Sequence, residues 1–64
     1  MFTTDVSALA VGTIFMCPDN THFYRVVKIL RRLKVVVIAE NLSYGMARIM
    51  AGHIKVMPLY SLSA

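Results

Sequence analysis

The hydrophobic and polar positions of residues 23–40 fit two different folds. The segment reads FYRVVKILRRLKVVVIAE and holds five of the seven Lys and Arg residues. As a helix over residues 21–33, it places the apolar side chains on one half of the helical wheel and the basic ones on the other. As a strand, it contains adjacent apolar pairs at 26–27 and 29–30, which require burial on both faces or a bulge. Periodicity alone therefore favours a helix.

Residue preferences favour the strand. Residues 23–27 (FYRVV) and 35–38 (VVVI) are rich in β-branched and aromatic side chains, which lose rotamer freedom in a helix and fit a pleated surface. The helical alternative is an α/β fold, β-α-β-α-β, with strands at 13–16, 34–39 and 54–59. Its parallel sheet needs cover on both faces, which two short helices provide poorly. We therefore predict an all-β domain and keep the α/β fold as the alternative.

Turn residues divide the remainder of the chain into short elements. Thr4 or Asp5 provides an N-cap for one or two helical turns, which Gly12 ends. The CPDNT sequence at 17–21 is the strongest turn signal, and residues 46–51 fit a fourth strand and a helical turn equally well. The other predicted strands cover residues 13–16, 22–30, 34–40 and 54–60, with 31–33 as the tip of the central hairpin. We expect residues 1–64 to form one small domain.

The order of these elements resembles that of SH3-like small β-barrels. From Val11 to Leu59 the chain reads VGTIF, a polar turn, FYRVVKI, a basic tip, KVVVIAE, a glycine-containing loop, ARI and IKVMPL. FYR followed by valines is similar to Tudor domains in particular. The resemblance implies a single five-stranded barrel with a short N-terminal helical turn. The loop at 41–46 reads NLSYGM instead of the acidic-aromatic-Gly-Asn turn that Tudor domains usually show, which argues against a cage for methylated ligands.

Size and composition predict an association with another chain. A 64-residue domain buries only about 60% of the surface of its unfolded chain, and the single Cys17 cannot form an internal disulfide. Hydrophobic residues make up 58% of the chain and mean hydropathy is +0.66. We therefore expect a homo-oligomer or a complex with a protein partner.

One unpaired cysteine fits a reducing compartment, and no signal peptide or membrane span is visible, so we expect a cytoplasmic protein that does not bind membranes.

The residues that carry most enzymatic chemistry are sparse. Asp5, Asp19 and Glu40 are the three acidic residues, and each has a structural explanation as a cap, a turn residue or a strand end. Cys17 and the two histidines, His22 and His53, lack the spacing of a zinc site, and no glycine-rich phosphate loop occurs. We expect no catalytic residue, metal or cofactor, and hence no enzyme.

The basic residues are the one functional signal. Seven Lys and Arg against three acidic residues give a net charge of +4 and an isoelectric point near 9.7. We predict a nucleic-acid-binding module, for DNA or RNA, that neutralises phosphates through its basic hairpin. Its predicted site consists of Arg25, Lys28, Arg31, Arg32 and Lys34, with Tyr24 or Tyr44 as a stacking face. The charges also fit a role in solubility alone.

Two other classes of function remain open. The first is a protein-interaction module or small inhibitor, such as a phage or plasmid accessory factor, that docks through a face formed by the apolar excess and the five methionines. The second is a structural subunit of a homo-oligomer, in which each copy buries the exposed apolar strand edge of the other. Neither would show the steep salt dependence expected of nucleic-acid binding.

Overall fold

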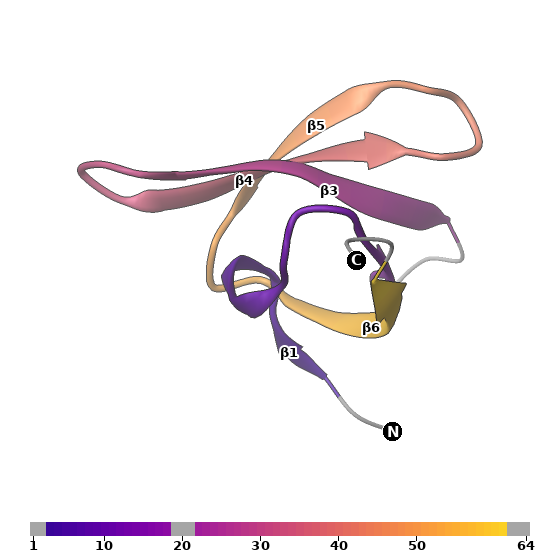
Figure 1. Cartoon of the computed structure of the whole chain (residues 1–64), viewed down its shortest axis with the longest axis horizontal. Helices are drawn as coiled ribbons and strands as arrows, with labels where there is room; N and C mark the ends of the chain where they lie inside the picture. Colours follow the sequence, from indigo (N-terminus) through magenta and orange to yellow (C-terminus); the bar gives the residue numbers. More distant parts are fainter. Residues whose placement is uncertain (1–2, 19–21, 62–64) are drawn as a thin grey trace.

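The chain folds as a single antiparallel β-sheet. The computed structural model describes residues 3–18 and 22–61, and within them it contains six strands and one short 3₁₀ turn (Figure 1). The strand order is β1-β6-β2-β3-β4-β5. The elements are β1 (Thr4–Asp5), the 3₁₀ turn η1 (Val6–Ala8), β2 (Thr13–Met16), β3 (Phe23–Arg31), β4 (Val35–Asn41), β5 (Ala47–Ala51) and β6 (Lys55–Ser61). The all-β prediction is confirmed, and the α/β alternative is wrong because residues 23–31 form a strand.

A β-bulge resolves the conflict between periodicity and residue preference in β3. The register with β4 shifts between Val26 and Lys28, so that Val27 is an extra residue. Val26 is buried, whereas Val27 next to it is 47% exposed. Strand alternation alone separates the environments of these two valines, and the extra residue shifts the alternation, so that Lys28 is also exposed and Ile29 packs against the core. Residues 46–51, which fit both a strand and a helical turn, contain strand β5.

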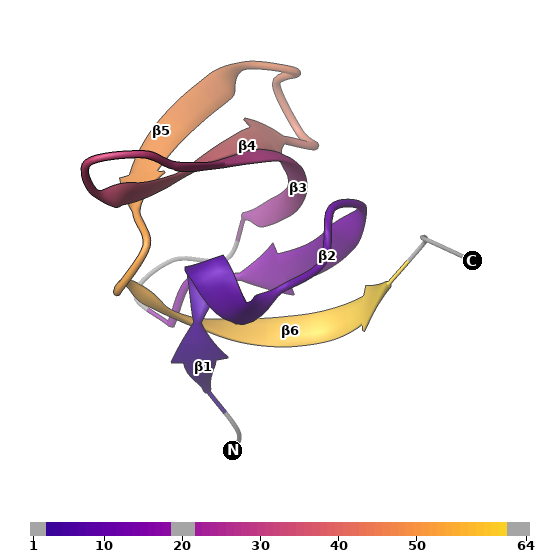
Figure 2. The same ribbon diagram turned by 60° about the vertical axis from the view of Figure 1, so that its left-hand side comes forward.

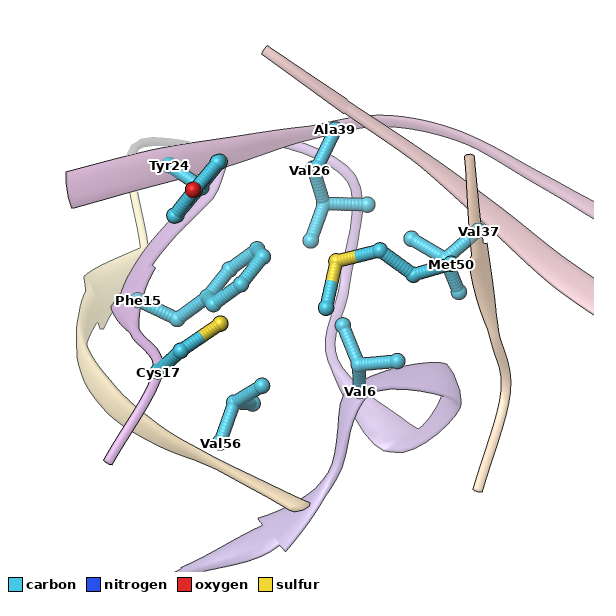
Figure 3. Close-up of a cluster of buried hydrophobic side chains, with 9 residues drawn as sticks. All are labelled: Val6, Phe15, Cys17, Tyr24, Val26, Val37, Ala39, Met50 and Val56. Atoms are coloured by element: carbon cyan, nitrogen blue, oxygen red, sulfur yellow. The ribbon is translucent and has the colours of Figure 1, made fainter. Parts of the chain in front are cut away.

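The curled sheet encloses one core. β3, β4 and β5 form one side, and β2, β6 and β1 form the other (Figures 1 and 2). Phe15 is fully buried, and its ring stacks on Tyr24 with a centroid distance of 5.5 Å. Side chains from η1 and from strands β2 to β6 meet between the two sides (Figure 3). The cluster consists of Val6, Phe15, Cys17, Tyr24, Val26, Val37, Ala39, Met50 and Val56.

The N-terminal segment connects β6 with the part of the β3–β4 hairpin next to its tip, because β1 pairs with β6 and Ser7 O accepts a hydrogen bond from Arg31. Its predicted helical turn is η1, which ends at Ala8 and not at Gly12. Gly12 instead has φ of 95° and donates its N–H to Val26 O at 2.9 Å, so it directs the chain into β2. Asp5 precedes η1 but makes no capping hydrogen bond, and its carboxylate pairs with Lys55 Nζ at 2.6 Å.

The position of Pro58 follows from the short length of β1. Pro58 lies opposite Phe15 of β2. On the other side of β6, the described residues of β1 pair only with Lys55 and Val56. Pro58 thus lies where β6 has one neighbouring strand, which is the edge-like position expected for a residue that has no N–H to donate.

Candidate nucleic-acid interface

The predicted basic hairpin is formed by β3 and β4. Its strands pair from Tyr24 opposite Asn41 to Arg31 opposite Val35, and residues 32–34 connect them. The structural tip therefore lies one residue further along the chain than predicted. In Figure 1 this tip extends away from the rest of the molecule, at the far end of the hairpin from the β4–β5 loop.

The surface of the hairpin that faces away from the core is both apolar and basic. Side chains alternate along a strand, so Val36 and Ile38 point outward because Val37 is buried. Lys28 lies opposite Ile38, and Leu30 opposite Val36. We call this surface, together with its continuation on β5, the outer face. It consists of Arg25, Lys28, Leu30, Val36, Ile38 and Glu40 on β3 and β4, and of Ala47, Ile49 and Ala51 on β5.

Three cations of the hairpin have no protein partner among the described residues. Lys28, Arg32 and Lys34 are exposed and form no ion pair or hydrogen bond there. Lys28 is on the outer face, and Arg32 and Lys34 are on the two sides of the tip. An ion that no carboxylate neutralises keeps its attraction for a phosphate. These three side chains are therefore the strongest candidates for an anion-binding surface.

The other two cations of the hairpin, Arg25 and Arg31, each have a hydrogen-bond partner in the protein. Arg25 donates to Glu40 Oε1 at 2.8 Å, in a half-exposed ion pair across the strands. Arg31 donates from Nη2 to the carbonyl oxygen of Ser7 at 3.0 Å. This bond leaves the charge of Arg31 without a counter-ion, but it holds the guanidinium against the N-terminal segment. Arg25 and Arg31 are two of the five predicted phosphate ligands. Glu40 neutralises the charge of Arg25, whereas Arg31 has a structural role where β3 meets the tip.

The predicted aromatic residues do not meet the basic tip. The ring of Tyr24 is 4% exposed, so it is part of the core and does not provide the expected stacking face. Its hydroxyl accepts a hydrogen bond from Arg48 Nη1 at 3.3 Å. Tyr44 is 69% exposed in the β4–β5 loop, with its ring centroid 5.4 Å from that of His22. This loop and the tip are separated by the length of β4, about 23 Å at 3.3 Å per residue.

Leu33 is the residue of the tip that the sequence analysis did not single out. It is 104% exposed, between Arg32 and Lys34. A shallow hollow beside it is lined by Leu30, Arg32, Leu33, Lys34 and Val36. The sequence contained an indication of this exposed leucine, because an apolar residue at the predicted tip of a hairpin has no core to pack against. The outer face of β3, β4 and β5 is not the predicted docking face of methionines, because it contains no methionine and Met50 belongs to the core.

Other kinds of site find little support in the described part of the chain. No group of three or more His, Cys, Asp or Glu side chains lies close enough there to hold a metal ion. None of its helical segments is long and apolar enough to cross a membrane. Comparison with known proteins gives no family model, no curated protein and no solved structure that matches this chain.

Proposed function

We propose that this protein is a small nucleic-acid-binding module that contacts the sugar-phosphate backbone with the β3–β4 hairpin. The observation that carries the proposal is the clustering of Lys28, Arg32 and Lys34, three cations without a counter-ion, on one hairpin. Lys28 on β3 and Arg32 just beyond its end are four residues apart, or about 13 Å of extended backbone.

We further propose that strands β2 to β6 constitute an SH3-like barrel. Consecutive strands from β2 to β5 pair as a meander, and β6 returns beside β2. The order β6-β2-β3-β4-β5 leaves an opening between β5 and β6. Two backbone hydrogen bonds support the idea that the N-terminal segment covers this opening: Val6 N–H to Ile54 O at 2.9 Å, and Ser7 N–H to Gly52 O at 3.2 Å. In this proposal β1 and η1 are additions to a five-strand unit.

The salt dependence of binding provides the quantitative test. Neutralising three phosphates gives a slope of log K against log salt of about −2.7, at 0.9 for each phosphate of B-DNA. Affinity should then fall about 40-fold between 50 and 200 mM salt. Fluorescence anisotropy of labelled single-stranded DNA, duplex DNA and RNA of one sequence measures the slope and shows which polymer is preferred.

Charge-removing variants locate the interface. We expect Arg32→Gln to weaken binding at low salt and to reduce the magnitude of the slope by about 0.9. Lys55→Gln is the matched control, because Lys55 is on β6 and already pairs with Asp5. Equal effects of the two substitutions would show that only the net charge matters. A chain that binds none of the three polymers at 50 mM salt would refute the proposal.

Docking of a protein through the outer face is the second candidate function. Ile49 on the edge strand β5 is 73% exposed opposite Ile38 of β4, and both belong to the outer face. A second copy of this chain or another protein would bury these residues, and the contact would weaken little with salt. Sedimentation of Ile49→Asp against the wild type tests this candidate. Identical, monomeric behaviour of both at micromolar concentration would exclude a homo-oligomer that uses this face.

A further inference from the structure

Leu33 has no structural role within the described part of the molecule. With an exposure of 104%, its side chain is at least as accessible as in an extended peptide. The outer face carries other exposed apolar residues, but each of those belongs to a strand that packs against its neighbours. Leu33 alone is at the extreme end of the hairpin, where a side chain can enter a narrow space in a partner.

We propose that Leu33 is a wedge that enters between two neighbouring bases, so that the preferred partner is a nucleic acid with an unstacked or easily unstacked step. This inference rests on the proposed function. Proteins that unstack bases use apolar side chains such as leucine for the insertion and nearby cations for the phosphates. Here Arg32 and Lys34 flank Leu33 directly, so one turn of three residues supplies both components.

The turn that carries Leu33 is hydrogen-bonded to the body of the domain at both of its ends. Arg31, at the end of β3, donates a hydrogen bond to Ser7 O at 3.0 Å. Val35, at the start of β4, accepts one from the N–H of Gly52 at 2.9 Å. Both strands of the hairpin are thus connected to the body of the domain immediately before and after residues 32–34. A short loop fixed at both ends loses little conformational freedom when its tip is inserted.

The backbone of the tip also suits an inserted leucine. Among the described residues, only glycines have a positive φ, so Arg32, Leu33 and Lys34 all have backbone conformations that ordinary side chains adopt. The backbone conformation of Leu33 is thus one that other residues adopt, so Leu33 can be replaced without backbone strain. Substitutions at this residue therefore test insertion separately from folding.

Base unstacking predicts a definite preference among nucleic acids. Opening a stacked step is least costly at a mismatched, damaged or unpaired base. The wild type should therefore bind a duplex that contains a one-base bulge about tenfold more tightly than the fully paired duplex, which is the scale expected for burying most of one leucine side chain. The two duplexes carry nearly the same number of phosphates, so the salt slopes should be alike.

The experiment compares the wild type with Leu33→Ala and Leu59→Ala on these two duplexes. Leu59 is a matched control, since it is a 48% exposed leucine on β6, in the other part of the sheet. Anisotropy gives the affinities and salt slopes, and 2-aminopurine beside the bulge reports unstacking by a rise in fluorescence. We expect Leu33→Ala to bind both duplexes equally, with an unchanged slope and no fluorescence rise, and Leu59→Ala to behave as the wild type.

The outcomes separate the wedge from the proposed function. If Leu33→Ala and the wild type show the same affinities and the same fluorescence, the wedge is refuted while backbone binding stands. If the wild type binds neither duplex nor single strands, both fail. Binding of the wild type, but not of Leu33→Ala, to phosphatidylserine vesicles without any fluorescence rise on DNA would also overturn the wedge, because the tip would then contact a lipid surface.

Discussion

Replacing Gly52 with alanine should destabilise the protein through a steric conflict with Val35, next to the tip of the hairpin. Gly52 lies between β5 and β6, where it donates to Val35 O and accepts from Ser7 N–H. A Cβ atom added to Gly52 would be 2.8 Å from Val35 Cγ1, 3.0 Å from Val35 Cβ and 3.0 Å from Ser7 Cβ. Two of these neighbours are Cβ atoms fixed to the backbone, so β4 or η1 must shift.

The magnitude follows from two opposing effects. Gly→Ala normally stabilises by about 0.4–1 kcal/mol where the backbone permits it, because the unfolded chain loses freedom. Forcing an extra carbon into a filled space costs about 1–3 kcal/mol. The net loss should be about 1–2 kcal/mol, or roughly 4–16 °C in melting temperature for a domain of this size.

Urea unfolding followed by circular dichroism measures this loss, and Gly45→Ala is the control. Gly45 has φ of +70° and no atom within 4 Å of the added Cβ, so its substitution costs about 1–2 kcal/mol through backbone conformation alone. Val35→Ala removes the closest clashing atom and should recover about 0.5–1.5 kcal/mol in combination with Gly52→Ala. It should recover nothing in combination with Gly45→Ala. A Gly52→Ala protein as stable as the wild type would refute the packing argument.

Three further substitutions test the core, the buried tyrosine and the charge pattern. Phe15→Ala should cost about 3–5 kcal/mol, which approaches the whole stability of a small domain, so its circular dichroism spectrum should lack a cooperative thermal transition. Tyr24→Phe removes the hydroxyl that accepts from Arg48 and should cost about 0.5–1.5 kcal/mol in urea unfolding, but nucleic-acid affinity should not change because the ring is buried. Glu40→Gln releases Arg25 from its half-exposed pair. It should change stability by less than about 1 kcal/mol and steepen the salt slope measured by anisotropy by about 0.9.

The sequence predicted the fold class because several weak preferences agreed. β-branched and aromatic residues over 23–31 and 35–41, together with the turn residues between them, identified the central hairpin to within one residue of its observed strands. Periodicity alone would have given a helix. The conflict arose from Val26 and Val27, and the bulge that resolves it depends on how β3 aligns with β4. Alignment between strands is a tertiary property, so a local pattern cannot locate the bulge.

The candidate site was predicted less completely than the fold. The basic tip follows from a run of cations at a turn, and the structure places Arg32 and Lys34 there. Tyr24 and Arg25 are neighbours in a strand, so only one of them can face the core. The packing of Phe15 against Tyr24 decides which one, and Phe15 is distant in sequence. Ion pairing between Arg25 and Glu40 depends on the same strand register, which sequence spacing does not reveal.

The distribution of charge bears on whether the cations serve solubility alone. A solubilising role requires only that charges be dispersed over the surface. In the described structure, however, Lys55 on β6 and Arg25 near the β4–β5 loop have carboxylate partners. The cations that form neither an ion pair nor a hydrogen bond there are Lys28, Arg32 and Lys34, on one hairpin and its tip, whereas Arg48 on β5 lacks a carboxylate partner but donates to the Tyr24 hydroxyl. A cluster of one sign of charge raises the local concentration of anions, and in the proposed function the phosphates of a nucleic acid are those anions.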